Sequence, residues 1–306
     1  MIIQERSMPL ILQIQTSLNN RMKLPLEHKR KYEQNQKGYE GEVAFDQYVE
    51  KIKPDCLILN DVRLKIDGNK VQIDSLFISE NKVYIVEVKN YKGEFHYKEG
   101  GLYLHSEKEI FNPLNQITRS RIIINNLLRS LQQEFSVEST VIFIHPDFFL
   151  YQAPVEKQFI YSNQIDKYLK KIKRESCISA DHSYRLAEKI VQIQYEEEIF
   201  NEDLPIYDEN TLKKGITCKK CHSYNHTSSR QNLYCKNCAY TEPISLAINR
   251  SIEEYQLLFP NKKITRRAIH KWCGEIYSEQ RIKRQLRDNF YLKGGGRSSY
   301  YELTSN

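Results

Sequence analysis

The spacing of apolar residues changes at Cys56, and the two parts of the chain predict different secondary structures. Before this point, residues such as Leu10, Ile14 and Leu18 recur at helical intervals, so we expect helices in residues 1–52. After it, short apolar runs rich in β-branched residues, separated by turn residues, predict an antiparallel meander. The strands that we expect are residues 56–66, 71–79 and 82–90, extended by 93–97 and 101–105.

Helices and further strands follow the meander. Asn112 suits the N-cap of a helix and Pro113 its first position, and an apolar stripe then continues to Leu131. The order helix, meander, helix, strand predicts an α/β fold with a mixed sheet. The later elements that we expect are strands at residues 140–144 and 158–161 and helices at 164–172 and 180–194.

The C-terminal third differs in character. An acidic stretch with Pro205 indicates a linker, and two Cys-x-x-Cys pairs follow it. The last residues predict three short helices, two of them capped by Thr265 and Ser278, and then a glycine-rich hairpin, an order that resembles a winged helix-turn-helix. We therefore expect an N-terminal helical segment (1–34), an α/β domain (35–200), a linker (201–216), a zinc ribbon (217–242) and a winged helix-turn-helix-like domain (243–306).

Composition excludes several classes of protein. The 306 residues are 40% hydrophobic and 28% charged, and no run approaches the roughly 20 apolar residues of a membrane helix. The first residues lack the basic and apolar stretches of a secretory signal, and the seven cysteines are too clustered for a disulfide scaffold. We expect a cytoplasmic protein without a membrane partner.

The positive charge is concentrated in the last third. From Thr211 onwards, 18 Lys and Arg residues face 7 Asp and Glu, a net charge of +11, whereas the preceding residues carry 28 against 32, a net charge of −4. Such a basic region is typical of a module that binds nucleic acid. The alternative is a basic surface that only keeps the protein soluble.

Four cysteines have the spacing of a zinc site. Each Cys-x-x-Cys pair can bring two thiolates to one ion, and the two pairs complete a tetrahedral shell with no open position, which predicts a structural Zn²⁺. Two disulfides or a redox pair fit a reducing compartment poorly. The expected ligands are Cys218, Cys221, Cys235 and Cys238, whereas His222 and His226 are expected to be loop residues.

Charged residues interrupt an otherwise apolar strand face in the meander. Alternation places Glu87 and Lys89 on the same face of the strand at 82–90, and Asp74 lies on the strand before it. Carboxylates beside a lysine on an apolar face are costly unless they are paired or bind a cation. The alternative is a simple salt bridge at the end of a strand.

Two further residues are candidates for the same site. Glu42 falls on the apolar stripe of a helix, at i−3 from Phe45, and Gln116 lies in the first turn of the helix capped by Asn112. The alternatives are a solvated helix flank for Glu42 and a hydrogen bond at a helix terminus for Gln116.

The motifs around these residues resemble the nuclease-related domain (NERD) family of the PD-(D/E)xK nuclease-like superfamily. The resemblance covers roughly residues 35–135, and one departure from the superfamily signature is that Ile73 precedes Asp74 in place of proline. It implies a restriction-endonuclease-like mixed sheet flanked by helices. The motifs are Gly38-Tyr-Glu-Gly-Glu42, Asn60-Asp61-Val62, Gln72-Ile-Asp74, Val86-Glu-Val-Lys-Asn90 with Gly93, and Asn112-Pro113 with Gln116.

The resemblance also implies a role for each candidate. Asp74 and Glu87 would hold Mg²⁺, or Mn²⁺, together with the carbonyl of Val88. Lys89 would orient the attacking water or stabilise the developing charge. Glu42 would bind the metal through water or assist a second ion, and Gln116 would position the phosphate or Lys89.

These observations together predict a metal-dependent nuclease with its own nucleic-acid-binding tail. The third helix of the tail would enter the major groove, which favours duplex DNA over RNA. The alternatives are a non-catalytic nucleic-acid-binding or sensor protein that uses the fold as a platform, and a tail that docks protein. The residues expected to contact nucleic acid are Arg281, Lys283, Arg284 and Arg287 on the helix and Arg297 on the wing.

Overall fold

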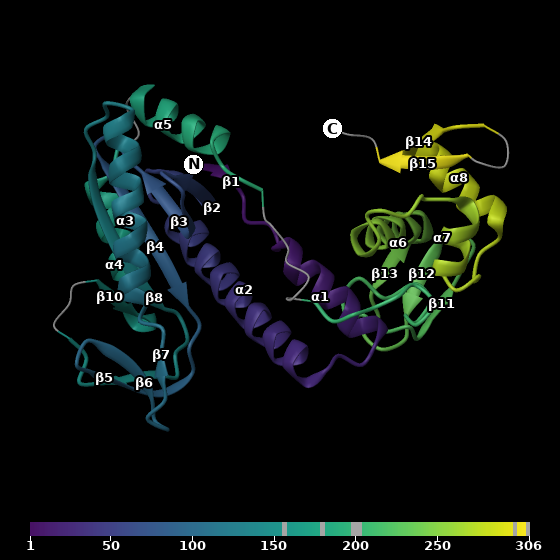
Figure 1. The fold of residues 1–306 in the computed structure, drawn as a ribbon, viewed down its shortest axis with the longest axis horizontal. Helices are drawn as coiled ribbons and strands as arrows, with labels where there is room; N and C mark the ends of the chain where they lie inside the picture. Colours follow the sequence, from purple (N-terminus) through teal and green to yellow (C-terminus); the bar gives the residue numbers. More distant parts are fainter. Residues whose placement is uncertain (155–157, 178–180, 197–203, 296–298, 304–306) are drawn as a thin grey trace. The chain divides into compact units, whose positions relative to one another are not determined.

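The structure is a computed structural model that describes residues 1–154, 158–177, 181–196, 204–295 and 299–303 (Figure 1). The chain forms two compact units. The first unit comprises residues 1–9 and 33–198, and the second comprises residues 10–32 and 199–306. The helix α2 (Leu26–Ile52) belongs to both, because the division falls within it.

A six-stranded mixed sheet forms the centre of the first unit, in the order β1-β2-β3-β4-β8-β10. The strands β2, β3 and β4 form the antiparallel meander expected from the sequence, whereas β4, β8 and β10 run parallel. This arrangement confirms the mixed α/β fold. The strands are β1 (Ile2–Gln4), β2 (Leu57–Ile66), β3 (Asn69–Ile78), β4 (Lys82–Lys89), β8 (Ser136–Phe143) and β10 (Phe159–Tyr161).

Helices cover both faces of this sheet (Figure 1). The helices α3 (Pro113–Ser130) and α5 (Asp181–Gln192) bury apolar residues against one face, and α2 and α4 (Ile165–Glu175) do so against the other. Asn112 caps α3 as expected, because its side chain accepts a hydrogen bond from the Leu114 N–H. The central strands are therefore apolar on both faces, which makes any charged residue on them conspicuous.

The strands that follow β4 do not extend the meander. Their residues form a second sheet in the order β7-β6-β5-β9, packed on an aromatic cluster that includes Phe95, Phe143 and Phe148. The reason is that β8 pairs with β4 from Lys82 to Lys89 and takes the edge that the next strand would need. The strands are β5 (Gly93–Lys98), β6 (Gly101–Leu104), β7 (Glu109–Ile110) and β9 (Phe148–Tyr151).

The N-terminal residues differ from the expected helical segment. The first strand, β1, pairs in parallel with β2 and belongs to the first unit. The helix α1 (Leu10–Arg21) packs against α6 in the second unit, where Ile14 and Leu18 are buried. The expected linker also contributes to this core through Leu212 and Ile216, because both are apolar side chains with almost no exposed surface.

The second unit combines a small sheet with a helical part. A three-stranded sheet lies among the cysteine pairs and carries Cys235 at the end of its middle strand; it consists of β11 (His226–Ser228), β12 (Asn232–Cys235) and β13 (Thr241–Pro243). Three helices follow, with Thr265 and Ser278 accepting the cap hydrogen bonds expected of them. The helices are α6 (Ile244–Leu258), α7 (Arg266–Trp272) and α8 (Glu279–Asn289), and the hairpin after them is β14 (Phe290–Lys293) with β15 (Tyr300–Leu303).

Among the residues that the structure describes, none of the helices combines the length and the apolar character needed to cross a membrane.

Candidate active site and metal centre

The register of the sheet places Asp74 and Glu87 side by side. Ser75 pairs with Val86 in the antiparallel strands β3 and β4, so Asp74 lies opposite Glu87 and their side chains share one face. Both residues are buried, with 7% and 3% of their surface exposed. Two carboxylates at a buried position on adjacent strands form the centre of the candidate active site.

Hydrogen bonds connect this pair to the other expected residues. The Val88 N–H donates to Asp74 Oδ2 at 2.7 Å. Lys89 Nζ donates to Glu87 Oε1 at 2.5 Å and to Gln116 Oε1, in the first turn of α3, at 3.1 Å. At Val88 it is therefore the N–H that contacts Asp74, while the expected role of its carbonyl as a metal ligand stays a prediction.

Glu42 reaches the site from α2, because a glycine allows the helix to approach closely. A Cβ added to Gly41 would lie 2.6 Å from the Asn90 Cβ, just after β4, so a larger residue would push the helix away. Asn90 Nδ2 also donates to the Lys37 carbonyl at 2.8 Å. These contacts hold Glu42 beside the end of β4, where burial, and then the charge of Asp74, raise the pKa of Glu42.

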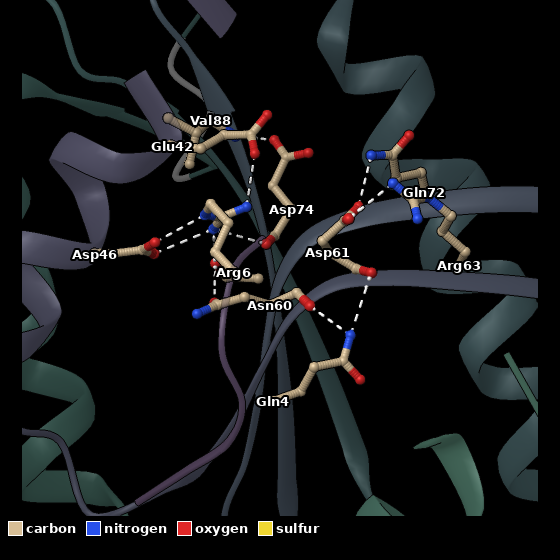
Figure 2. A network of polar contacts seen from close by, with 11 residues as sticks. Gln4, Arg6, Glu42, Asp46, Asn60, Asp61, Arg63, Gln72, Asp74 and Val88 are labelled. Carbon is tan, nitrogen blue, oxygen red and sulfur yellow. Dashed lines mark hydrogen bonds and ion pairs between the residues drawn. The ribbon is translucent and has the colours of Figure 1, made fainter. Parts of the chain in front are cut away.

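Arg6 also belongs to the site, although the sequence patterns do not identify it as a site residue (Figure 2). Its Nη1 donates to Glu42 Oε2 at 2.6 Å, and its Nε and Nη2 donate to the two carboxylate oxygens of Asp46 at 2.8 and 3.1 Å. Its Nη2 also donates to the Asp74 carbonyl and to Ser75 Oγ, each at 2.9 Å. Arg6 thus ties α2 to β3, and only its pairing partners, far away in the sequence, reveal this role.

The remaining motif residues form a network of polar contacts on β2 and β3 (Figure 2). Ser75 Oγ donates to Asn60 Oδ1 at 2.8 Å, and Gln72 Nε2 donates to Asp61 Oδ1 at 2.7 Å. Arg63 pairs with Asp61 at 2.8 Å. These contacts orient β2 and β3. None of them involves the carboxylate of Glu87.

Burial makes the carboxylates difficult to ionise. Loss of solvent, and then the charge of Asp74, raise the pKa of both Glu42 and Glu87 to about 8, although Arg6 and Lys89 oppose these shifts. Burial likewise raises the pKa of Asp74 against the effects of Lys89 and the Val88 N–H. The Lys89 pKa is raised even though burial lowers it, because Glu87 and Asp74 favour its charged form.

The donor set fits a hard divalent cation. Asp74 and Glu87 offer carboxylate oxygens from adjacent strands, and Mg²⁺ prefers such ligands while it keeps several waters. A cation would offset the charge of Asp74, which, after burial, is what raises the pKa of Glu87. The site therefore has both the ligands and the electrostatic demand for a divalent ion.

The four expected cysteines converge in the second unit. Their sulfur atoms all lie within 4.8 Å of one another, with Cys218 Sγ 3.6 Å from Cys238 Sγ and Cys221 Sγ 3.5 Å from Cys235 Sγ. Tetrahedral Zn²⁺ with bonds of about 2.3 Å needs sulfurs roughly 3.8 Å apart, so this cluster could bind zinc. His226, expected in a loop, is instead the first residue of β11, because it pairs with Cys235 of β12; its ring contacts the Ile216 carbonyl at 3.0 Å.

The basic residues of α8 differ in their surroundings. Ile282 and Leu286 are buried as expected, while Lys283, Arg284 and Arg287 are exposed. Arg281 is only half-exposed, because its Nη2 donates to the Arg230 carbonyl at 3.1 Å and its guanidinium lies over the ring of Tyr277. Arg297, expected on the wing, lies outside the described residues.

A mixed sheet between helices, with buried acids and a lysine on adjacent strands, defines a nuclease-like α/β domain. Residues 37–144 match the nuclease-related domain family, so the chain carries a nuclease-related domain, as the sequence motifs indicate. Arg6 precedes the matched residues. No curated protein and no solved structure shows a significant match to the chain.

Proposed function

We propose that the protein is a metal-dependent nuclease that hydrolyses phosphodiester bonds in DNA. The observation that carries this proposal is the cluster of Asp74, Glu87 and Lys89 on β3 and β4 inside a nuclease-related domain. A protein that used the fold only as a platform would have no need of three charged groups in a buried site, where they lower stability unless they act on a ligand.

Asp74 and Glu87 are the residues that would hold Mg²⁺ or Mn²⁺. When bound, the ion offsets charge on the phosphate and makes hydroxide available near neutral pH. Lys89 is held at the same place by Glu87 and Gln116, so its ammonium group can orient the attacking water or stabilise the charge that develops on phosphate. Gln116 keeps Lys89 directed towards the phosphate.

The second unit would bind the DNA. The order of α7, α8 and the hairpin supports a winged helix-turn-helix. The Tyr301 N–H also donates to the Ile264 carbonyl at 2.8 Å, so residue 264, just before α7, is bonded to the hairpin strand β15. Lys283, Arg284 and Arg287 would contact phosphates or bases from the exposed side of α8. The cysteine cluster would hold a structural Zn²⁺.

Cleavage of labelled nucleic acid tests this function. Duplex DNA, single-stranded DNA and RNA are incubated with the protein in Mg²⁺, Mn²⁺ or EDTA, and we expect cleavage of DNA that EDTA abolishes. Lys89→Ala should reduce the activity by about 10²–10³-fold. Lys92→Ala is the matched control, because Lys92 is an exposed lysine three residues further along whose partner is Asp147 at the surface. Equal activity of both variants, or none in the unaltered protein, would favour the non-catalytic platform.

A further inference from the structure

Arg6 is the positively charged residue that pairs with Glu42 in the candidate site. Its guanidinium uses Nη1 for Glu42 and a two-pronged contact for Asp46. A second divalent ion in a nuclease site would need the oxygens of an acid in the position of Glu42. Here Glu42 Oε2 already accepts a charge-assisted hydrogen bond at 2.6 Å.

The charges of the site leave room for one divalent ion. With every carboxylate ionised, as cation binding would favour, Glu42, Asp46, Asp74 and Glu87 face the two cations of Arg6 and Lys89, which leaves two negative charges. Asp61 does not change this difference, because Arg63 pairs with it at 2.8 Å. One divalent cation balances the remaining charge, whereas a second would leave the buried site with two uncompensated positive charges.

The chain holds Arg6 too firmly for a metal ion to displace it. The Arg6 side chain is only 3% exposed and donates to the Asp74 carbonyl and Ser75 Oγ in addition to the two acids. The strand β1 anchors the preceding residues on β2, and Gln4 Nε2 donates to the Asn60 carbonyl at 2.7 Å. Arg6 therefore belongs to the folded framework and is not a mobile surface residue.

We propose that Arg6 is a positioning residue that takes the place of a second cation, so that the site binds a single divalent ion on Asp74 and Glu87. This inference rests on the metal site of the proposed nuclease and specifies its stoichiometry. Glu42 is then not a ligand of a second ion. It holds Arg6, which in turn fixes the position of β3. Without the guanidinium, Glu42 and Asp46 would both lose their partner. The two carboxylates would then form a second site for a divalent ion.

The test counts Mn²⁺ ions on the full chain after the cysteine cluster has been filled with Zn²⁺. Titration calorimetry and the paramagnetic resonance signal of free Mn²⁺ should give one ion per chain for the unaltered protein. Arg6→Gln should bind two, and Arg6→Lys should still bind one, because the ammonium group restores the charge. Lys51→Gln is the control and should keep one ion, since it removes an exposed cation of α2 that pairs with Asp166 and leaves the Arg6 contacts in place.

The results separate this inference from the proposed function. Two Mn²⁺ ions on the unaltered protein would overturn the inference and leave the nuclease intact, while no bound Mn²⁺ would overturn both. If Arg6→Gln fails to fold, Glu42→Gln decides the question. A single-ion site keeps one Mn²⁺ in that variant, whereas a fall from two ions to one would overturn the inference. One ion in a folded Arg6→Gln protein would also overturn it.

Discussion

Lys89 donates to both Glu87 and Gln116, and this fork links β4 to the first turn of α3. The link fixes the ammonium group between a strand residue and a helix residue that are 27 positions apart. A lysine normally samples many rotamers, so the second bond restricts the position of its charge. The Lys89–Gln116 pair is therefore expected to act as one functional group.

Coupling between these two residues is the first prediction. Lys89→Met should slow DNA cleavage by about 10²–10³-fold, the range found for the loss of one group that stabilises a transition state. Gln116→Leu should slow it by about 10-fold, and the double variant should be no slower than Lys89→Met, because Gln116 acts only through Lys89. Single-turnover rates of the three variants measure this. Independent, multiplying effects would contradict it.

The pH dependence of stability is the second prediction. The pKa of both Glu42 and Glu87 rises from 4.5 to about 8 on folding, so the folded protein binds more protons than the unfolded chain between these values. Without a divalent ion, the free energy of unfolding should therefore be highest below about pH 4.5, as far as these groups are concerned, and fall as the pH rises to about 8. Denaturant titrations in EDTA from pH 5 to 9 measure the slope.

The same titrations include a variant and a ligand that should change this slope. Glu87→Gln should flatten it, since the amide does not titrate and no longer adds to the repulsion with Asp74. Mg²⁺ should stabilise the protein more at pH 9 than at pH 6, because it competes with protons for the carboxylates. A stability that does not fall between pH 5 and 8 in EDTA would show that folding does not raise the pKa values of the two acids.

Zinc content is the third prediction. Elemental analysis should find about one zinc ion per chain, since four thiolates make one closed site. Cys235→Ser should lose the ion and loosen the small sheet of the second unit, because β12 carries Cys235, while the first unit keeps its cooperative unfolding. Cys177→Ser is the control, as Cys177 is an exposed free cysteine. Zinc retained by Cys235→Ser would exclude the four-cysteine site.

The anchoring of α1 gives the fourth prediction. Arg21 is buried in the second unit, donates twice to Glu254 at 2.8 and 2.5 Å, and lies 3.9 Å from the ring centre of Trp272. Arg21→Leu should destabilise this unit by about 3 kcal/mol, because Glu254, whose side chain is only 13% exposed, keeps a partly buried charge without its partner. Arg21→Leu with Glu254→Leu should recover part of the loss. Chemical denaturation followed by Trp272 fluorescence measures both, and a single variant of unaltered stability would contradict the prediction.

The exposed side of α8 gives the fifth prediction. Arg284→Ala and Lys283→Ala should each reduce the slope of log affinity against log salt by about 0.9 if each side chain neutralises one DNA phosphate. Arg281→Ala should change it less, because that side chain is engaged with Arg230 and Tyr277. Fluorescence anisotropy at several salt concentrations measures the slopes. Unchanged slopes would indicate that the second unit docks protein instead of DNA.

The sequence predicts the parts of the site that depend on local patterns. Alternation along one strand places Glu87 and Lys89 on one face, and a short turn makes Asp74 its neighbour, so their convergence could be expected. Asn112, Thr265 and Ser278 could be identified as caps because a cap depends on a few adjacent residues.

Other features depend on contacts between distant residues and leave no periodic signal. The strand β1 has three residues and pairs with a strand more than fifty positions away, so neither it nor the Arg6 contacts could be predicted. The apolar stripe of α1 predicts a helix but not its partner, which is α6. Likewise, the residues of β5 predict a strand, but only the occupied edge of β4 decides which sheet it joins.

The division of the second unit between the two ends of the chain has a consequence for its synthesis. A ribosome completes the strands of the six-stranded sheet once residue 161 has emerged, so the first unit can fold while translation continues. Ile14 and Leu18, by contrast, have been made long before Ile248 and Ile252, against which their core is built. The apolar side of α1 therefore stays without its packing partner on the nascent chain until α6 has been made.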